Sequence, residues 1–162
     1  MRQILLFYFF IIFWNGFSQK TIPEVLKQFN NNSVPYISVA ALKLKENILI
    51  FDARELKEFN VSHLKNAQYV GFDKFSSKKI RTLFKNQNTT IVVYCSIGVR
   101  SEKIGEKLIK LGYKNVFNLF GGIFEWKNMG EEVYDNDEKI TQNIHTFSKE
   151  WNQYALKGNK IY

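Results

Sequence analysis

Two kinds of hydrophobic pattern alternate between residues 35 and 130. Short runs rich in β-branched and aromatic residues, typical of buried strands, occupy 36–37, 48–51, 69–70, 91–94 and 115–119. Apolar residues at helical spacing predict helical segments over 38–44, 54–59, 80–84 and 101–111, and another after Gly121 and Gly122. Strands that alternate with helices indicate an α/β fold, with a central, mostly parallel five-stranded sheet and helices on both faces.

Three of the predicted strands end at positions that suit chemistry. Asp52 ends the strand at 48–51, Cys95 follows the strand at 91–94, and the glycine pair follows the strand at 115–119. Ligands of parallel sheets bind beyond the carboxyl ends of the strands. We therefore expect these three positions to lie close together.

The loop from Cys95 to Arg100 is the strongest candidate site. It separates a strand from a predicted helix, and loop amides ahead of a helix N-terminus favour bound anions. The same field favours the thiolate form of a thiol at the base of the loop. Gly98 permits a tight turn, and Arg100 provides a planar cation. A lone cysteine is otherwise a small buried apolar residue, but Gly98 and Arg100 at this spacing favour a nucleophile at Cys95.

These motifs make the sequence similar to the rhodanese-like domain family of sulfurtransferases. The active loop of that family, Cys-x-x-Gly-x-Arg, is matched by Cys95, Gly98 and Arg100. An upstream family pattern is matched by Asp52, Arg54, Glu58, Phe59, His63, Leu64 and Ala67. The closing signature of the family is matched by Gly121, Gly122, Ile123 and Trp126. The three motifs occur in the family's order and imply one rhodanese-like unit over residues 35–130.

The resemblance implies a sulfurtransferase without a cofactor. Cys95, the expected catalytic residue, would take a sulfane sulfur from a small anionic donor such as thiosulfate and hold it as a persulfide. A thiol, an acceptor protein or cyanide would then remove the sulfur. The donor is expected to be bound by the loop residues Ser96, Ile97, Gly98, Val99, Arg100 and Ser101.

Two other functions would use the same loop. The domain would be a non-catalytic persulfide carrier or binding module if Cys95 only passed sulfur between proteins. Certain cell-cycle phosphatases also resemble this fold and use a cysteine and an arginine, but their loop is one residue longer. Only four residues separate Cys95 from Arg100, so we expect the ring of amides to be too tight for phosphate.

The polar residues of the upstream pattern are interpreted mainly as structural. Arg54 and Glu58 are spaced at i, i+4, at which salt bridges form on a helix. We expect Asp52 to anchor backbone near the active loop, Arg54 to lie near the rim of the pocket, and His63 to tie down a loop. His145 lies outside the matched motifs and is expected on the surface. No pair of histidines or carboxylates has metal-ligand spacing, so no metal is expected.

Residues 1–18 are predicted to form a signal peptide. Arg2 provides a minimal positive region, residues 4–14 are apolar, and Gly16 and Ser18 fit cleavage after Ser18. We therefore expect export to a periplasm, without stable membrane insertion after cleavage; the alternative is an uncleaved membrane anchor. Cys95 is the only cysteine. An unpaired thiol in an oxidising compartment is a liability unless it is used, so export also favours a functional Cys95.

Segments flank the predicted domain on both sides. Residues 19–34 predict a helix over 21–29 and a polar linker. Residues 131–162 form a C-terminal extension, with an acidic loop at 131–138 followed by Phe147, Trp151 and Tyr154 at i, i+4 and i+7. That spacing predicts a helix that packs on the domain or, alternatively, docks a partner. The net charge is +8, but the lysines are spread along the chain without a concentrated run. This distribution argues against nucleic-acid binding.

Overall fold

The computed structural model describes residues 20–162 of the chain. The predicted signal peptide at 1–18 lies outside the described residues. Within 20–162, no helix has both the length and the apolar character needed to cross a bilayer.

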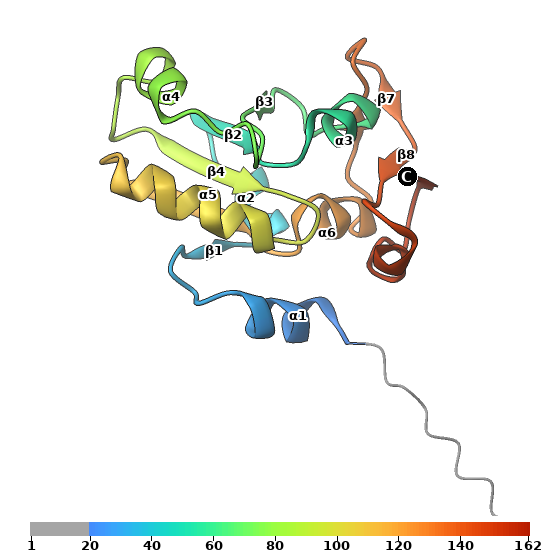
Figure 1. Cartoon of the computed structure of the whole chain (residues 1–162). Coiled ribbons are helices and arrows are strands. Elements are labelled where there is room, and N and C mark those ends of the chain that lie inside the picture. The colour runs from blue at the N-terminus through green and yellow to red at the C-terminus, as the bar shows by residue number, and fades with distance from the viewer. Residues whose placement is uncertain (1–19) are drawn as a thin grey trace, which may run out of the picture.

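A five-stranded sheet forms the centre of the molecule, and all of its strands are parallel (Figure 1). Its spatial order is β1-β5-β4-β2-β3, so β4 lies in the middle. The strands are β1 (Tyr36–Ile37), β2 (Ile48–Asp52), β3 (Gln68–Tyr69), β4 (Thr90–Tyr94) and β5 (Asn115–Leu119). In register, Asp52 lies opposite Tyr94, and Val93 lies opposite Asn118. The predicted α/β architecture is confirmed.

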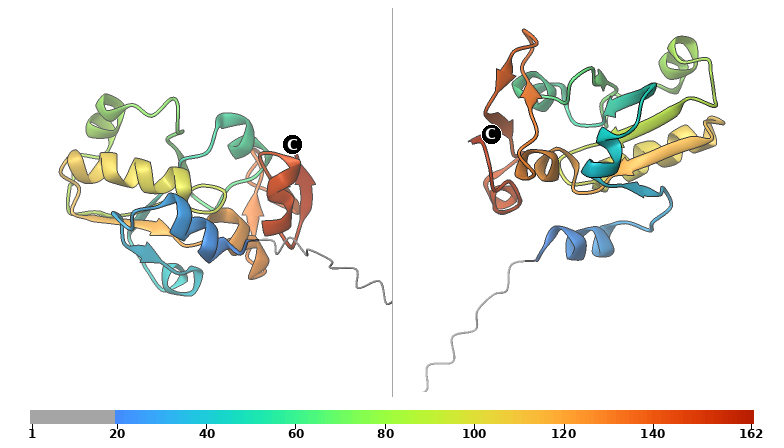
Figure 2. Two further views of the ribbon diagram at one scale, coloured as in Figure 1. Left: turned by 60° about the horizontal axis from the view of Figure 1, so that its bottom comes forward. Right: turned by 180° about the vertical axis from the view of Figure 1, so that it is seen from behind.

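Helices cover both faces of the sheet, as predicted (Figure 2). Ile91 and Val93 of β4 pack against α4 (Ser77–Leu83) and α5 (Val99–Lys110), in a core that also contains Ile104 of α5. The alternate residues Val92 and Tyr94 face a second core, built with α2 (Val39–Lys43) and α6 (Gly122–Asn128). The short helix α3 (Leu56–Val61) follows β2. The period of two along a fully buried strand therefore divides the core into two layers.

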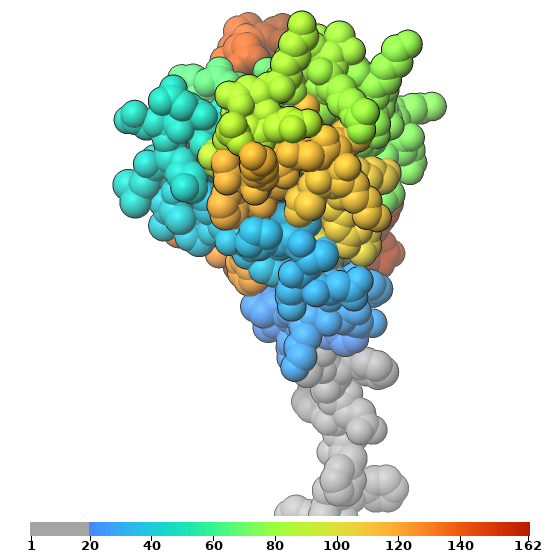
Figure 3. All heavy atoms as spheres, turned by 90° about the vertical axis from the view of Figure 1, so that its left-hand side faces the viewer, coloured from blue at the N-terminus to red at the C-terminus, as the bar shows by residue number. Residues whose placement is uncertain are grey.

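The N-terminal segment packs against the start of α5. The predicted helix at 21–29 is confirmed as α1 (Ile22–Phe29), which begins with a capping box between Thr21 and Glu24. The linker after α1 is fixed by Glu102, whose carboxylate accepts the Ser33 backbone N–H over 2.8 Å and the Asn31 N–H over 3.2 Å. In Figure 3 this segment (blue) forms one end of the molecule, next to α5 (yellow).

The C-terminal extension differs from its prediction. The supposed acidic loop contains β6 (Val133–Tyr134), which pairs antiparallel with β7 (Ile140–Thr141). Next come β8 (Asn143–His145), the 3-10 helix η1 (Lys149–Tyr154) and β9 (Asn159–Ile161), which pairs with β8. The helix predicted through Phe147, Trp151 and Tyr154 is confirmed in part: Trp151 and Tyr154 lie on η1 and pack against the core. Phe147 lies outside it, because its φ of +66° does not fit a right-handed helix. The turn at Phe147 joins β8 to η1, after which β9 pairs in parallel with β8.

Candidate active site

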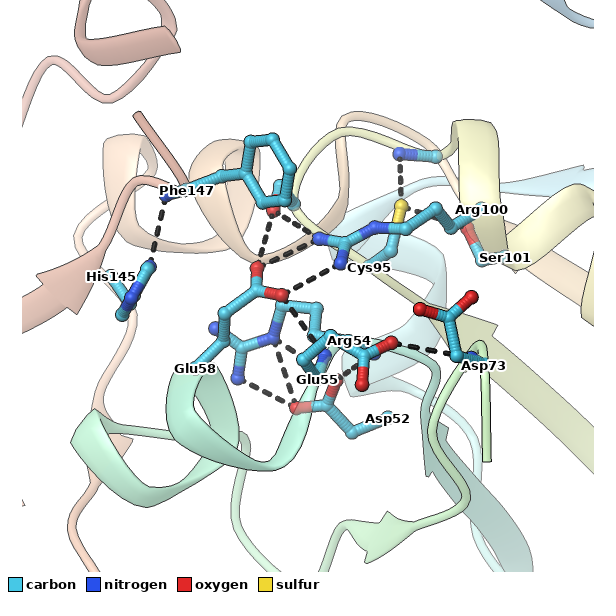
Figure 4. A network of polar contacts seen from close by, with 12 residues as sticks. Asp52, Arg54, Glu55, Glu58, Asp73, Cys95, Arg100, Ser101, His145 and Phe147 are labelled. Carbon is cyan, nitrogen blue, oxygen red and sulfur yellow. Dashed lines mark hydrogen bonds and ion pairs between the residues drawn. The ribbon is translucent and has the colours of Figure 1, made fainter. Parts of the chain in front are cut away.

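Cys95 lies at the carboxyl end of the central strand, and its thiol faces into the loop that follows (Figure 4). Its Sγ accepts a hydrogen bond from the Gly98 backbone N–H over 3.1 Å and lies 3.5 Å from Ser101 Oγ. Gly98 has a φ of +118°, a left-handed conformation that glycine adopts without a steric penalty. The loop is shorter than predicted, because α5 already begins at Val99.

The environment of Cys95 favours the thiolate. Burial of the thiol raises its pKa, but the positive charge of Arg100 and hydrogen bonds from Ser101 and Gly98 outweigh burial. The net effect lowers the pKa of Cys95 from the ordinary value of 9.0. A larger fraction of Cys95 is therefore nucleophilic near neutral pH than for a free cysteine.

Two asparagines hold the Gly98 carbonyl. Asn30 Nδ2 donates to this oxygen over 2.9 Å, and Asn118 Nδ2 donates to it over 2.8 Å. Asn118 also accepts a hydrogen bond from Ser101 Oγ over 2.7 Å. The two hydrogen bonds to the carbonyl hold the backbone at Gly98, whose own N–H, in the preceding peptide unit, donates to Cys95 Sγ. Sequence reasoning missed both asparagines, although a polar Asn118 between the apolar residues Phe117 and Leu119 was a usable signal.

The glycine pair lies directly against the loop, as the convergence of strand ends predicts. Ile123 N–H donates to the Cys95 carbonyl over 2.9 Å, and Phe124 N–H donates to the Ser96 carbonyl over 3.1 Å. A Cβ on Gly122 would lie 2.3 Å from the Cys95 carbonyl oxygen. Only glycine allows the first turn of α6 to approach this closely, so α6 fixes the outer side of the loop.

Arg100 is paired with Glu58 rather than left free. Its Nη1 donates to Glu58 Oε2 over 2.6 Å and its Nη2 to Oε1 over 2.7 Å (Figure 4). Nη2 also lies 3.0 Å from Ser96 Oγ. Burial raises the pKa of Glu58, but the hydrogen bonds and charge of Arg100 outweigh burial and lower it. The predicted salt bridge between Arg54 and Glu58 is therefore wrong.

Arg54 forms a separate, fully buried ion pair with Asp52. Arg54 Nε lies 3.0 Å from Asp52 Oδ1, and Nη2 lies 2.6 Å from Oδ2 and 2.6 Å from the Ser62 carbonyl. Arg54 precedes α3, so the helical i, i+4 spacing to Glu58 does not apply. The side chain of Arg54 is 0% exposed, and its predicted place at the pocket rim is wrong. Asp52 accepts the Arg54 backbone N–H, consistent with an anchoring role.

Both histidines, His63 and His145, are buried. His63 stacks on Phe59 at a centroid distance of 4.1 Å, and its backbone exchanges hydrogen bonds with Tyr134, so it ties a loop to the extension as expected. His145 is buried, against its predicted surface position, because β8 packs against α3. Its Nδ1 accepts the Phe147 backbone N–H over 2.9 Å. Within residues 20–162, no group of three His, Cys, Asp or Glu side chains is arranged to hold a metal ion.

A cavity of about 230 Å³ opens over Cys95. It is lined by Phe29, Cys95, Ser96, Ile97, Val99, Arg100, Phe147 and Trp151. The loop residues predicted to bind substrate therefore lie at the cavity, except that Gly98 and Ser101 contact the sulfur from behind. Sequence reasoning did not place Phe29, Phe147 or Trp151 here, because three separate elements bring them together.

The part of the chain that carries the Cys95 loop is similar to several known proteins. The chain is 31% identical over 106 residues to the putative sulfur carrier protein YrkF of Bacillus subtilis, covering 63% of this chain and 56% of that protein. It is 26% identical to the thiosulfate sulfurtransferase GlpE of Coxiella burnetii, covering 58% of this chain and 85% of that protein. A tRNA uridine(34) hydroxylase of Prochlorococcus marinus is 30% identical over 74% of this chain. The chain spans 44% of that protein, so it matches about half the length of two of these relatives.

Structural comparison and the family model agree on the fold. The rhodanese-like domain of the Alr3790 protein from Anabaena sp. superposes with a TM-score of 0.58 at 20% identity, covering 62% of this chain and 79% of that one. The family model described as "Rhodanese-like domain" matches residues 38–129, more than half of the chain. With Cys95, Gly98 and Arg100 brought together at the end of the central strand, the chain belongs to the rhodanese-like domain family.

Proposed function

We propose that this protein is a sulfurtransferase in which Cys95 carries the transferred sulfur as a persulfide. The observation that carries the proposal is the position of Cys95 Sγ at an open cavity, with Gly98 N–H 3.1 Å away. Arg100 lines the same cavity, and its charge lowers the pKa of the thiol. A thiolate that is reachable from one side is the arrangement that attack on a donor sulfur requires.

The reaction has two steps that balance around Cys95. In the first, the thiolate attacks the outer sulfur of thiosulfate, the Cys95 S–S bond forms, the S–S bond of the donor breaks, and sulfite leaves with the electron pair. In the second, cyanide or an acceptor thiolate attacks the outer sulfur and restores the Cys95 thiolate. The Gly98 N–H donates to Sγ and the Ser101 hydroxyl lies 3.5 Å from it, and both help to stabilise the thiolate that starts the first step and is restored by the second.

The steady-state assay is thiocyanate formation from thiosulfate and cyanide. We expect turnover that is abolished in Cys95→Ser and retained in Ser77→Ala, a matched serine variant on the exposed surface of α4. The relative named thiosulfate sulfurtransferase supports this assay, since the chain covers 85% of its length. Absence of turnover with both cyanide and small thiols, in folded protein, would reject a small-molecule sulfurtransferase.

A persulfide carrier is the second candidate function. It is supported by the match to the putative sulfur carrier protein. A carrier would accept sulfur once, stoichiometrically, and release it to cyanide far more slowly than it was loaded. Separate measurement of loading and unloading rates distinguishes a carrier from an enzyme.

We also propose that the protein is exported and cleaved after Ser18. The support is the apolar segment at 4–14 followed by small residues. Expression of the full chain in a bacterium, followed by fractionation and N-terminal sequencing, should give a periplasmic protein that starts at Gln19. Intact Met1 in the membrane fraction would instead establish an uncleaved anchor.

A further inference from the structure

Three aromatic side chains around the cavity come from outside the segment matched by the family model. Phe29 ends α1, and Phe147 and Trp151 belong to the C-terminal extension, whereas the family model matches residues 38–129. Phe29 is 52% exposed and Phe147 is 50% exposed. Half-exposed rings contribute little to the core. Trp151 also packs against the core, but the position of Phe29 and Phe147 beside it at the cavity over Cys95 calls for another explanation.

Phe147 adopts a conformation that a bulky residue rarely takes. Its φ is +66°, in the left-handed region where asparagine and glycine are preferred. The backbone is held there by the hydrogen bond from Phe147 N–H to His145 Nδ1, and the ring lies 5.3 Å from the Arg100 guanidinium carbon (Figure 4). A strained residue that persists at the edge of a reactive site points to a functional role for its side chain.

The charges around the cavity do not suit a dianion. Of the described residues that line it, Arg100 is the one cation, and both of its terminal nitrogens bind the carboxylate of Glu58. Thiosulfate would bring two negative charges next to the Cys95 thiolate, where the one cation is already compensated. A donor with a single charge and an apolar body avoids most of that cost and can contact the rings.

The size of the cavity fits such a donor. An apolar cavity of about 150 Å³ is known to accept one benzene molecule, and the cavity over Cys95 measures about 230 Å³. It therefore has room for one aromatic ring together with a sulfonyl group. Phe29, Phe147 and Trp151 provide the aromatic surface for that ring.

We propose that the sulfur donor of this protein is an organic, monoanionic sulfane-sulfur compound, whose apolar body is bound by Phe29, Phe147 and Trp151. This inference rests on the proposed function of Cys95. With a thiosulfonate, the Cys95 thiolate attacks the outer sulfur, the new S–S bond forms, and the sulfinate leaves with the electron pair of the broken bond. Two negative charges enter the step and two leave it, so no further reactant is needed.

The test compares loading of Cys95 by benzenethiosulfonate, methanethiosulfonate and thiosulfate. Both organic donors carry one charge and release a sulfinate, so the ratio of their second-order rates reports recognition of the ring. The same ratio for free cysteine in solution gives the intrinsic reactivity. Phe147→Asn removes the ring and keeps a residue that tolerates the left-handed backbone, so folding is preserved. Trp151→Ala is the second variant, and Leu156→Ala, exposed in the same extension and away from the cavity, is the matched control.

We expect the benzene-to-methane ratio of the native protein to exceed that of free cysteine by roughly tenfold or more, the effect of burying one ring. The ratio should fall toward that of free cysteine in Phe147→Asn and Trp151→Ala and stay high in Leu156→Ala. A native ratio equal to that of free cysteine, or one that neither ring variant changes, would overturn the inference while leaving the persulfide of Cys95 in place. Failure of all three donors to load Cys95 would instead refute the proposed function itself.

Discussion

Arg100 and Glu58 join two elements that are far apart in the sequence through a two-pronged ion pair. The two N–O distances are 2.6 and 2.7 Å, the Glu58 side chain is 0% exposed, and that of Arg100 is 19% exposed. The pair fastens the start of α5, and with it the Cys95 loop, to α3. The pair also holds the Arg100 cation near Cys95, where it favours the thiolate. At the same time, the carboxylate of Glu58 compensates the positive charge of Arg100.

Loss of Arg100 is expected to destabilise the fold. Arg100→Ala leaves the Glu58 carboxylate buried without its partner, and breaking such a pair from one side costs about 3 kcal/mol or more in the free energy of unfolding. Urea denaturation measures this cost. The control is Lys103→Ala, which breaks a surface pair with Glu106 and should cost about 1 kcal/mol or less. Equal stability of Arg100→Ala and the native protein would contradict a structural role for the pair.

The pair also predicts how stability depends on pH. The pKa of Glu58 in the folded protein lies below its ordinary value of 4.5. The unfolded chain therefore binds the proton first as pH falls, and the stabilisation by Glu58 is complete above the unfolded value and declines below it, toward the folded pKa. The free energy of unfolding, taken from denaturation curves between pH 3 and pH 7 and plotted against pH, should have a shallower slope in Glu58→Gln than in the native protein. Identical slopes in the two proteins would refute the assigned ionisation.

Ser101 is expected to tune the reactivity of Cys95. Its hydroxyl lies 3.5 Å from Sγ, and its hydrogen bonds help to lower the pKa of the thiol. In Ser101→Ala, the pH midpoint of alkylation by iodoacetamide should therefore move upward. Ser77→Ala, on the exposed surface of α4, serves as the control and should keep the native midpoint. An unchanged midpoint in folded Ser101→Ala would show that Ser101 does not act on the thiol.

Gly122 should be intolerant of a methyl group for a reason specific to the site. Its added Cβ would lie 2.3 Å from the Cys95 carbonyl oxygen, whereas that of Gly130 would be 3.6 Å from the end of Lys157. Both glycines have positive φ, so backbone strain is common to the two alanine variants. We expect Gly122→Ala to lose about 1–3 kcal/mol more stability than Gly130→Ala, and to react more slowly at Cys95. Equal losses would show that the loop simply moves away.

The parts of the site that the sequence predicts are those encoded locally. The β4 run of β-branched residues, the cysteine that follows it and the spacing to Arg100 all lie on one short segment. The partners of the charged residues were not predictable in the same way. The i, i+4 spacing of Arg54 and Glu58 has meaning only on a common helix, and α3 begins after Arg54.

The aromatic wall of the cavity shows the same limit. Phe147 and Trp151 are spaced as on one face of a helix, but Phe147 lies in a left-handed turn after β8, where its N–H donates to His145 Nδ1. Phe29 lies more than a hundred residues away in the sequence and reaches the same cavity because Glu102 fixes the linker after α1. Tertiary packing, rather than local propensity, decides these positions.

The central claim is that Cys95 carries sulfur, and intact-protein mass spectrometry tests it most directly. The full chain is incubated with thiosulfate or benzenethiosulfonate, freed of donor, and measured before and after cyanide is added. We predict a gain of one sulfur atom, located on the peptide that contains Cys95, lost on addition of cyanide and absent in Cys95→Ser. A folded protein that gains no sulfur from either donor, while Cys95 remains open to alkylation, would contradict the account.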